Sequence, residues 1–261
     1  MEKVISKDGT SIAYDKHGTG SPLILVDGAL CGRKFGPMPK LAALLAQHFT
    51  VINYDRRGRG DSTDTKPYSP QREIDDLDAL IQAARGPVYV CGFSSGAVLA
   101  LEAAAKGLNI KKLALFETPY NVDGKGHIAP KDFLEHLTAL IREDKRGEAV
   151  KYFIHDMVGL PAIAVIIMKL MPVWKKLKAV AHTLPYDAAL LNGQVLPAQR
   201  AVTIKVPTLV LAGSKSPENM QNTMKAVAEA IPGSQLKILP GQTHNVAAKA
   251  IAPELISFFK A

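Results

Sequence analysis

The sequence predicts an α/β protein with a mostly parallel sheet that is covered by helices on both sides. Short runs rich in β-branched residues alternate with helical patterns, and several of the short runs are too continuously apolar to have one face in water. Strands of this kind are typical of parallel sheets with helices in the connections. A chain of 261 residues, of which 47% are apolar, is long enough to bury one sizeable core.

Six segments are expected to form the strands of this sheet. They are Ser21–Gly28, Phe49–Asp55, Gly86–Gly92, Lys111–Glu117, Val206–Gly213 and Ser234–Gly241. Between Tyr120 and about Arg200 the alternation stops, and this block offers helical candidates without a convincing strand. We therefore expect residues 1–119 and 201–261 to form the core domain, and residues 120–200 to form an inserted helical cap.

The composition narrows the partners of the protein. The formal net charge is +8, but basic and acidic residues are interspersed, as in the stretch IREDKRGE, which favours a solvated surface over a nucleic-acid site. The N-terminus lacks the pattern of a secretory signal, and the longest apolar run, around Ala162–Lys169, is shorter than the roughly 20 residues of a bilayer span. We expect a cytoplasmic monomer or homodimer that acts on a small molecule, with no nucleic-acid or membrane partner.

The two cysteines, Cys31 and Cys91, are expected to be free thiols that pack as small buried residues, because disulfides are rare in a reducing compartment. No Cys-x-x-Cys pair, phosphate-binding loop or cluster of metal ligands is evident. The sequence therefore implies neither a cofactor nor a metal.

The clearest chemical signal is the segment Gly92-Phe93-Ser94-Ser95-Gly96, which has the pattern G-x-S-x-G. This pattern describes a sharp turn from a strand into a helix that holds the central serine exposed at the carboxyl end of the strand. The pattern alone is weak, but here a strand-like run precedes it and a helix-like run follows it. We interpret Ser94 as a nucleophile that lies beside the N-terminal dipole of the next helix.

With this turn the chain resembles the α/β-hydrolase family over nearly its whole length. Leu23–Gly32 (LILVDGALCG) is similar to the oxyanion loop of that family, with Asp27 and Gly28 where a His-Gly pair is common. Asn53–Ser62 (NYDRRGRGDS) is similar to the family segment Y-D-x-R-G-x-G-x-S, and the resemblance implies a structural turn for Asp55, Arg56 and Arg57.

The resemblance also implies the oxyanion hole. The backbone N–H groups of Ala29 and Ser95 would form it, and Gly28 would allow the loop to approach closely. The sequence gives no reason for a carboxylate at Asp27, beside a site for an anion.

A serine hydroxyl needs a base to become a nucleophile, and His244 is the expected base. It follows the last predicted strand and precedes a terminal helical pattern, where the resembled family carries its catalytic histidine, and the order serine, acid, histidine also fits. The other histidines are expected to be ordinary: His17, His48, His127, His136, His155 and His182.

The acid is less evident, because Ser216 occupies the position where the family usually has an aspartate. Glu117, at the end of the strand Lys111–Glu117, is the preferred candidate, and its place resembles that of the glutamate of some haloalkane dehalogenases. Glu218 is the alternative, the absence of a working acid is another, and Asp123 is a weaker spare.

These residues predict a serine hydrolase of the carboxylesterase class that cleaves an ester or related acyl bond of a small apolar substrate. Ser94 would attack the carbonyl, His244 would transfer the proton, and Glu117 would orient the imidazole. Haloalkane dehalogenases and epoxide hydrolases are excluded because they attack with an aspartate. A carbon–carbon bond hydrolase, a perhydrolase, a lyase and a non-catalytic ligand receptor remain alternatives on the same fold.

The cap is expected to set specificity. Leu160–Trp174 is apolar nearly all round, so we expect this segment to be buried, in cap-to-core packing or as pocket lining. Met157, Met168, Met171 and Trp174 are plausible lining residues, although such spacing is more typical of a core.

Overall fold

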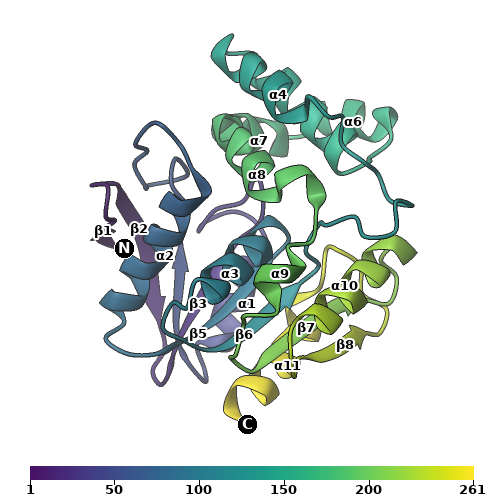
Figure 1. Ribbon diagram of the computed structural model, residues 1–261. Helices are drawn as coiled ribbons and strands as arrows, with labels where there is room; N and C mark the ends of the chain where they lie inside the picture. The colour runs from purple at the N-terminus through teal and green to yellow at the C-terminus, as the bar shows by residue number, and fades with distance from the viewer.

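The computed structural model describes residues 1–261 and contains one eight-stranded sheet with helices on both faces (Figure 1). The strand order is β1-β2-β4-β3-β5-β6-β7-β8. The strands are β1 (Glu2–Ile5), β2 (Ser11–His17), β3 (Pro22–Val26), β4 (Thr50–Tyr54), β5 (Val88–Phe93), β6 (Ile110–Phe116), β7 (Thr208–Gly213) and β8 (Gln235–Leu239). β3 to β8 run parallel, and β2 pairs antiparallel with both of its neighbours, β1 and β4. The predicted fold class is confirmed.

All six predicted strands are present, but the sequence analysis missed β1 and β2. β1 is mostly exposed, and β2 mixes buried and exposed residues in the run SIAYDKH. Continuous apolar runs mark strands that are covered on both faces, whereas the edge strand β1 and its neighbour β2 pair antiparallel and are partly in water. Their signal is therefore weaker than that of β5 and β7, in which every residue is buried.

The sheet separates two hydrophobic clusters, and successive side chains of a strand enter opposite ones, as the two-residue period of a strand requires. On β3, Leu23 and Leu25 belong to the cluster of α1 and α11, whereas Ile24 and Val26 belong to the cluster of α2, α3 and α10. These helices are α1 (Met38–Leu45), α2 (Pro70–Ala83), α3 (Ser95–Ala105), α10 (Glu218–Ala230) and α11 (Ala248–Lys260).

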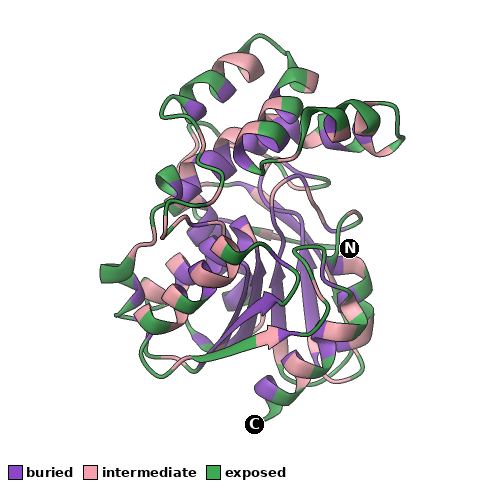
Figure 2. Ribbon diagram, turned by 90° about the vertical axis from the view of Figure 1, so that its right-hand side faces the viewer, coloured by how far each residue is buried: buried purple, intermediate pink, exposed green.

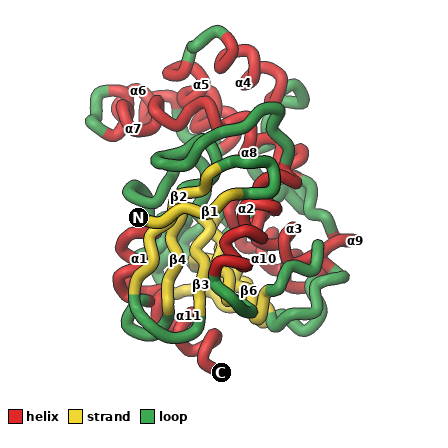
Figure 3. Tube along the Cα trace, turned by 90° about the vertical axis from the view of Figure 1, so that its left-hand side faces the viewer, coloured by secondary structure: helices red, strands yellow, loops and turns green.

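The chain between β6 and β7 forms the helices that lie above the sheet (Figures 1 and 3). They are α4 (Phe133–Arg142), α5 (Arg146–Tyr152), α6 (Ala162–Lys169), α7 (Val173–Val180), α8 (Leu184–Leu191) and α9 (Ala198–Ala201), with short η1 (Phe153–Met157), η2 (Ala181–Thr183) and η3 (Asn192–Gln194) turns. We call α4 to α8 the cap. α9 packs against α3 and α10, so the chain has returned to the core domain by that point. None of the helices combines the length and the hydrophobicity that a bilayer crossing requires.

The expected burial of Leu160–Trp174 is wrong for most of the segment. Val165 and Trp174 are buried, but Ile163, Ile167 and Leu170 are 64%, 55% and 85% exposed. α6 lies at the edge of the cap (Figure 1), and its main contacts are with α7 and η1. The outer surface of the cap helices is largely exposed (Figure 2). A helix that is apolar all round is usually enclosed, but enclosure also needs neighbours on every side, and the sequence of the helix does not reveal them.

This correction predicts unequal effects of substitution in α6 and α7. Ile167→Ser should change the free energy of unfolding by less than about 0.5 kcal/mol, because the side chain is largely in water. Leu177→Ala on α7 should lower it by about 2 kcal/mol or more, because Leu177 is 7% exposed and its truncation leaves a cavity. Urea unfolding of both variants checks this, and equal losses would contradict the exposed position of α6.

Candidate active site

Ser94 stands at a sharp turn between β5 and α3. It has φ 53° and ψ −126°, a backbone conformation that is strained for a residue with a side chain. A Cβ atom at Gly92 would lie 2.5 Å from the Gly96 carbonyl oxygen, and one at Gly96 would lie 2.3 Å from the Val26 carbonyl oxygen. Only glycine therefore allows strand, helix and the neighbouring β3 to approach this closely, which is the physical basis of the G-x-S-x-G pattern.

Glu117 directly follows β6 and is completely buried, with φ 46°. Its Oε1 accepts hydrogen bonds from the Gly213 amide at 2.8 Å and from the Ser216 hydroxyl at 2.5 Å. Its Oε2 lies 2.7 Å from Nδ1 of His244. Both carboxylate oxygens are therefore partnered, and one of them is directed at the imidazole ring.

His244 lies in the loop after β8, and its side chain is 45% exposed. The ring stacks on Phe116, the residue before Glu117, with 6.3 Å between the ring centroids. With Nδ1 beside a carboxylate, the ring is held in the tautomer that leaves Nε2 free to accept a proton.

The other acid candidates lie elsewhere. Ser216, which occupies the expected aspartate position, donates its hydroxyl to Glu117 instead of facing the histidine. Glu218 is exposed at the start of α10 and makes no contact with His244. Asp123 lies in the loop after β6 and accepts a hydrogen bond from Asn222 of α10. Of the acids considered from the sequence, only Glu117 reaches the histidine.

A cavity of about 480 Å³ lies between the sheet and the cap. The five residues proposed from the sequence all line it: Ala29, Ser94, Ser95, Glu117 and His244. The Ser94 hydroxyl and the His244 ring share this cavity without a direct hydrogen bond between them. No lysine or arginine lines it, and its cap wall includes Phe153, Met157 and Leu160.

Met157 is the one plausible lining residue from the sequence analysis that reaches the cavity. Trp174 is buried within the cap, and Met171 is 52% exposed. His127 also lines the cavity, which the sequence gave no reason to expect. Cys91 is buried, whereas Cys31 is only partly buried and lines the cavity.

Two backbone N–H groups of residues that line the cavity have no protein acceptor. The Ser95 amide is at the first position of α3, where an amide has no intrahelical partner, and the Ala29 amide follows the end of β3. A Cβ atom at Gly28 would lie 3.1 Å from Cβ of Ser94, so the two segments are in close contact. The arrangement brings two free donors and the serine together at one end of the cavity.

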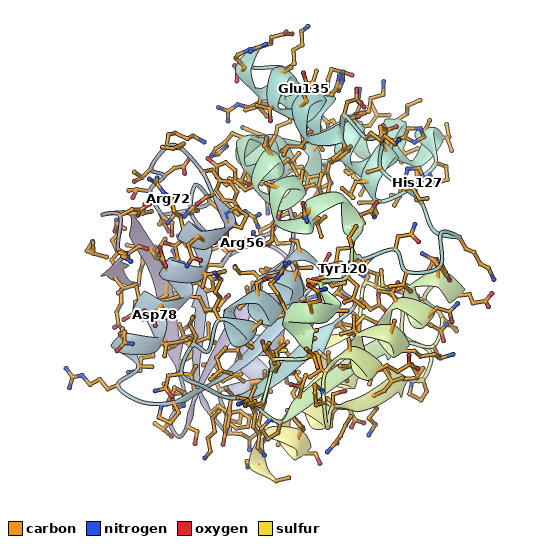
Figure 4. The ribbon with its side chains drawn as sticks, in the orientation of Figure 1. Arg56, Arg72, Asp78, Tyr120, His127 and Glu135 are labelled. Carbon is orange, nitrogen blue, oxygen red and sulfur yellow. The ribbon has the colours of Figure 1, made fainter.

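A buried ionic network joins the cap to these two segments. Asp187, on α8 of the cap, accepts hydrogen bonds at 2.7 Å from the Ser95 hydroxyl, from Arg56 Nη1 and from Arg59 Nη2. Arg59 Nη1 also donates to the Gly28 carbonyl oxygen at 2.6 Å. Arg56 lies at the boundary between core domain and cap (Figure 4). It also donates two hydrogen bonds of 2.7 Å to Glu73 and longer ones to the Ser95 hydroxyl at 3.3 Å and the Asp27 carbonyl oxygen at 3.4 Å. Although burial opposes it, the charges of Arg59 and Arg56 lower the pKa of Asp187.

The sequence analysis missed Asp187 and Arg59. Two signals for them were available: Asp187 is a lone aspartate in the apolar run LPYDAALL, and Arg59 is the third arginine in NYDRRGRGDS. Both could have been noticed because a buried charge needs a partner. Nothing in the sequence paired them across 128 residues. Arg57 bonds Asp76 and Asp8 on the side of α2, away from the cavity.

Asp27 is 2% exposed, and its carboxyl group has one partnered and one unpartnered oxygen. Oδ1 accepts the Gly28 amide at 2.9 Å, and Oδ2 has no hydrogen-bond partner. Burial raises the pKa of Asp27 to about 7, against the opposing effects of the Gly28 hydrogen bond and of Arg59 and Arg56. The Asp27 carboxyl group is therefore neutral under mildly acidic conditions. A neutral carboxyl group does not repel an anion bound at the nearby Ala29 and Ser95 amides.

The arrangement provides no evident metal site, because no group of three or more His, Cys, Asp or Glu side chains is placed to hold an ion. Of the remaining histidines, His17, His48, His136, His155 and His182 lie outside the cavity lining.

Comparisons with known proteins identify the family of the chain. A family model described as the alpha/beta hydrolase family matches residues 17–252, and the chain belongs to that family of hydrolases. The pimeloyl-[acyl-carrier protein] methyl ester esterase of Stenotrophomonas maltophilia is 29% identical over 231 residues, which cover 85% of each chain.

Solved structures extend the likeness. An alpha/beta hydrolase from Sphaerobacter thermophilus is 49% identical, with a TM-score of 0.94 over 99% of this chain and 100% of that one. A thermophilic esterase from Thermogutta terrifontis shares the fold, with a TM-score of 0.74 at 20% identity over 99% of this chain and 97% of that one. The chain is thus a hydrolase-family protein with esterase relatives.

The environment of Asp27 predicts a pH dependence of stability. The ordinary pKa of 3.8 rises to about 7 in the folded state, so the folded protein holds the proton more tightly than the unfolded chain. Stability therefore falls as pH rises from about 4 to about 7, and the loss is complete above that range. Between about pH 5 and pH 8 this group should remove about 2 to 3 kcal/mol.

Asp27→Asn removes the ionisation and keeps the shape of the side chain. Urea unfolding at the two pH values should show a smaller decline in the variant than in the wild type. Identical declines would mean that Asp27 is ionised in the folded state throughout this range.

Proposed function

We propose that the protein is a serine carboxylesterase that cleaves small, uncharged, largely apolar esters through an acyl-enzyme. The observation that carries this proposal is the contact of 2.7 Å between His244 Nδ1 and the buried Glu117, in the cavity that also holds Ser94. This pairing is the orienting half of a catalytic triad, which is recognised by geometry and roles and not by the position of the acid in the chain.

The attack begins at Ser94. In the proposed reaction His244 Nε2 takes the proton of the Ser94 hydroxyl as its oxygen attacks the ester carbonyl, and then passes that proton to the leaving alcohol. Serine and histidine are not hydrogen-bonded to each other in this structure, and such contacts often tighten only when substrate is present. Water activated by the same histidine then attacks the acyl-serine and releases the acid.

The negative charge on the carbonyl oxygen would be held by the Ala29 and Ser95 amides, which have no protein acceptor. Fixed donors in a site closed to water stabilise such a charge strongly. Asp187 supports the segments that carry both amides, because it accepts a hydrogen bond from the Ser95 hydroxyl and holds Arg59, which donates to the Gly28 carbonyl oxygen. Asp187 and Arg59 are thus positioning residues, and their effect on the reaction would be indirect.

The lining of the cavity supports an uncharged substrate. With no lysine or arginine on its wall, the cavity offers no ion-pair partner for a carboxylate substrate, and Phe153, Met157 and Leu160 favour an apolar group. Esterase relatives fit this proposal, including one whose name specifies a methyl ester.

The first test compares two adjacent serines. Ser94→Ala should lower the turnover of a small aryl ester by more than about a thousandfold, because the nucleophile is gone. Ser95→Ala should retain activity within about tenfold, because the backbone amide remains and only the side-chain hydrogen bonds to Asp187 and Arg56 are lost.

Fluorophosphonate labelling gives a second readout for the same variants. The probe should modify the wild type and the Ser95 variant but not the Ser94 variant. Turnover that survives Ser94→Ala would refute the proposed nucleophile, and a wild type that resists the probe at every pH would favour a ligand receptor.

The second test identifies the acid. Glu117→Gln should lower kcat by about 10⁴-fold, because an amide that faces Nδ1 favours the wrong imidazole tautomer. Glu218→Gln is the matched control and should retain nearly the wild-type rate, because Glu218 is exposed and away from the histidine. Steady-state kinetics with thermal melts of both variants make the comparison, and the opposite ranking would return the acid to the loop after β7.

A further inference from the structure

An apolar stripe on α6 faces away from the protein. Ile163, Ile166, Ile167 and Leu170 follow the spacing i, i+3, i+4, i+7, which places them on one side of a helix. They are 64%, 54%, 55% and 85% exposed, and Met171 beside them is 52% exposed. We call these five residues the α6 patch. Single exposed apolar residues are ordinary, but a contiguous set of this kind marks a surface that something covers.

The segment that carries the α6 patch is rich in lysine. The chain from Val158 to Val180 contains four lysines and no acidic residue. Lys175, Lys176 and Lys178 on α7 are exposed and form no ion pair, and Lys176 Nζ lies over the Phe35 ring. Lys169 lies over the Trp174 ring and 3.5 Å from Glu148. α6 and α7 pack on each other at the edge of the cap (Figure 3), so these lysines and the apolar stripe lie in the same part of the cap.

We propose that the α6 patch and the α7 lysines dock the protein on the surface of an anionic lipid bilayer. Aliphatic side chains would enter the boundary between headgroups and acyl chains, and the lysines would lie among anionic headgroups, as in helices that rest in a membrane interface without crossing it. The sequence analysis expected no membrane partner because it found no secretory signal and no apolar run long enough to span a bilayer, and docking on the surface needs neither.

Two other occupants fit the chemistry less well. A second copy of the chain in a two-fold contact would bring the same lysines of both copies together, and like charges oppose such a contact. A protein partner is usually held by Trp, Tyr and Arg, and lysine is depleted at such interfaces. The α6 patch has none of those three residues and lies in a segment that is rich in lysine.

The position of the patch connects docking to the cavity. Val158 is 50% exposed and also lines the cavity, and it lies five residues before Ile163. An apolar ester dissolved in the bilayer would therefore meet the cavity close to the docked surface. This last step rests on the proposed esterase function, whereas docking itself does not require turnover.

Vesicle flotation with the full chain tests the proposal without any enzymatic readout. Vesicles of phosphatidylcholine with about 30% phosphatidylglycerol should bind the protein at least about tenfold more strongly than vesicles of pure phosphatidylcholine, and high salt should weaken the binding. The triple variant Ile163→Ser, Ile167→Ser, Leu170→Ser should lose binding to both kinds of vesicle. The triple variant Lys175→Gln, Lys176→Gln, Lys178→Gln should lose the preference for anionic vesicles.

The matched control replaces exposed apolar residues elsewhere, with Ile5→Ser and Val202→Ser, and should bind as the wild type does. Thermal melts verify that each variant is folded. Absence of flotation for the wild type, or flotation unaffected by the α6 substitutions, would overturn the proposal. A dimer in analytical ultracentrifugation that the α6 substitutions dissociate, without vesicle binding, would instead assign the patch to a second copy.

Discussion

The site depends on one buried carboxylate. Glu117 joins β6, the loop after β7 and the loop after β8 through three hydrogen bonds. A carboxyl group without exposure to water needs hydrogen-bond partners for both of its oxygens, and here a backbone amide, a hydroxyl and an imidazole supply them. Because these partners come from the end of β7, the turn that follows it and the loop after β8, the same bonds also fix where the histidine lies.

Ser216 illustrates how an acid can move within a fold while the histidine keeps its place. A hydroxyl donor directed at Glu117 helps to hold a carboxylate that arrives from the neighbouring strand end. The carboxyl ends of β6 and β7 are adjacent because these two strands pair in parallel, so either can supply a side chain to the same point. The strand order therefore allows an acid after either β6 or β7 to orient the imidazole ring of His244.

Local patterns in the sequence carried most of the fold and the main residues of the site. The strands covered on both faces were evident as apolar runs, and the turn at Ser94 was evident because its glycines have a steric cause. The sequence did not reveal the strands β1 and β2, the exposure of α6 or the Asp187 network. Each of these features depends on which elements are neighbours in space, and the type of a side chain does not reveal its neighbours. The raised pKa of Asp27 was equally hidden, because it follows from burial.

The link from Asp187 to Ser95, Arg56 and Arg59 limits how the cap can diversify among related proteins. A cap transplanted without an aspartate at this point of α8 would leave the buried Arg59 without its carboxylate partner, whereas Arg56 would keep Glu73. An unpaired buried charge is far less favourable than the loss of an ordinary contact. No ion pair joins α4 to α7 to Gly28 or Ser95 in this way. Inherited variation in what the cavity accepts should therefore accumulate in these outer helices, while α8 keeps its position on the sheet domain.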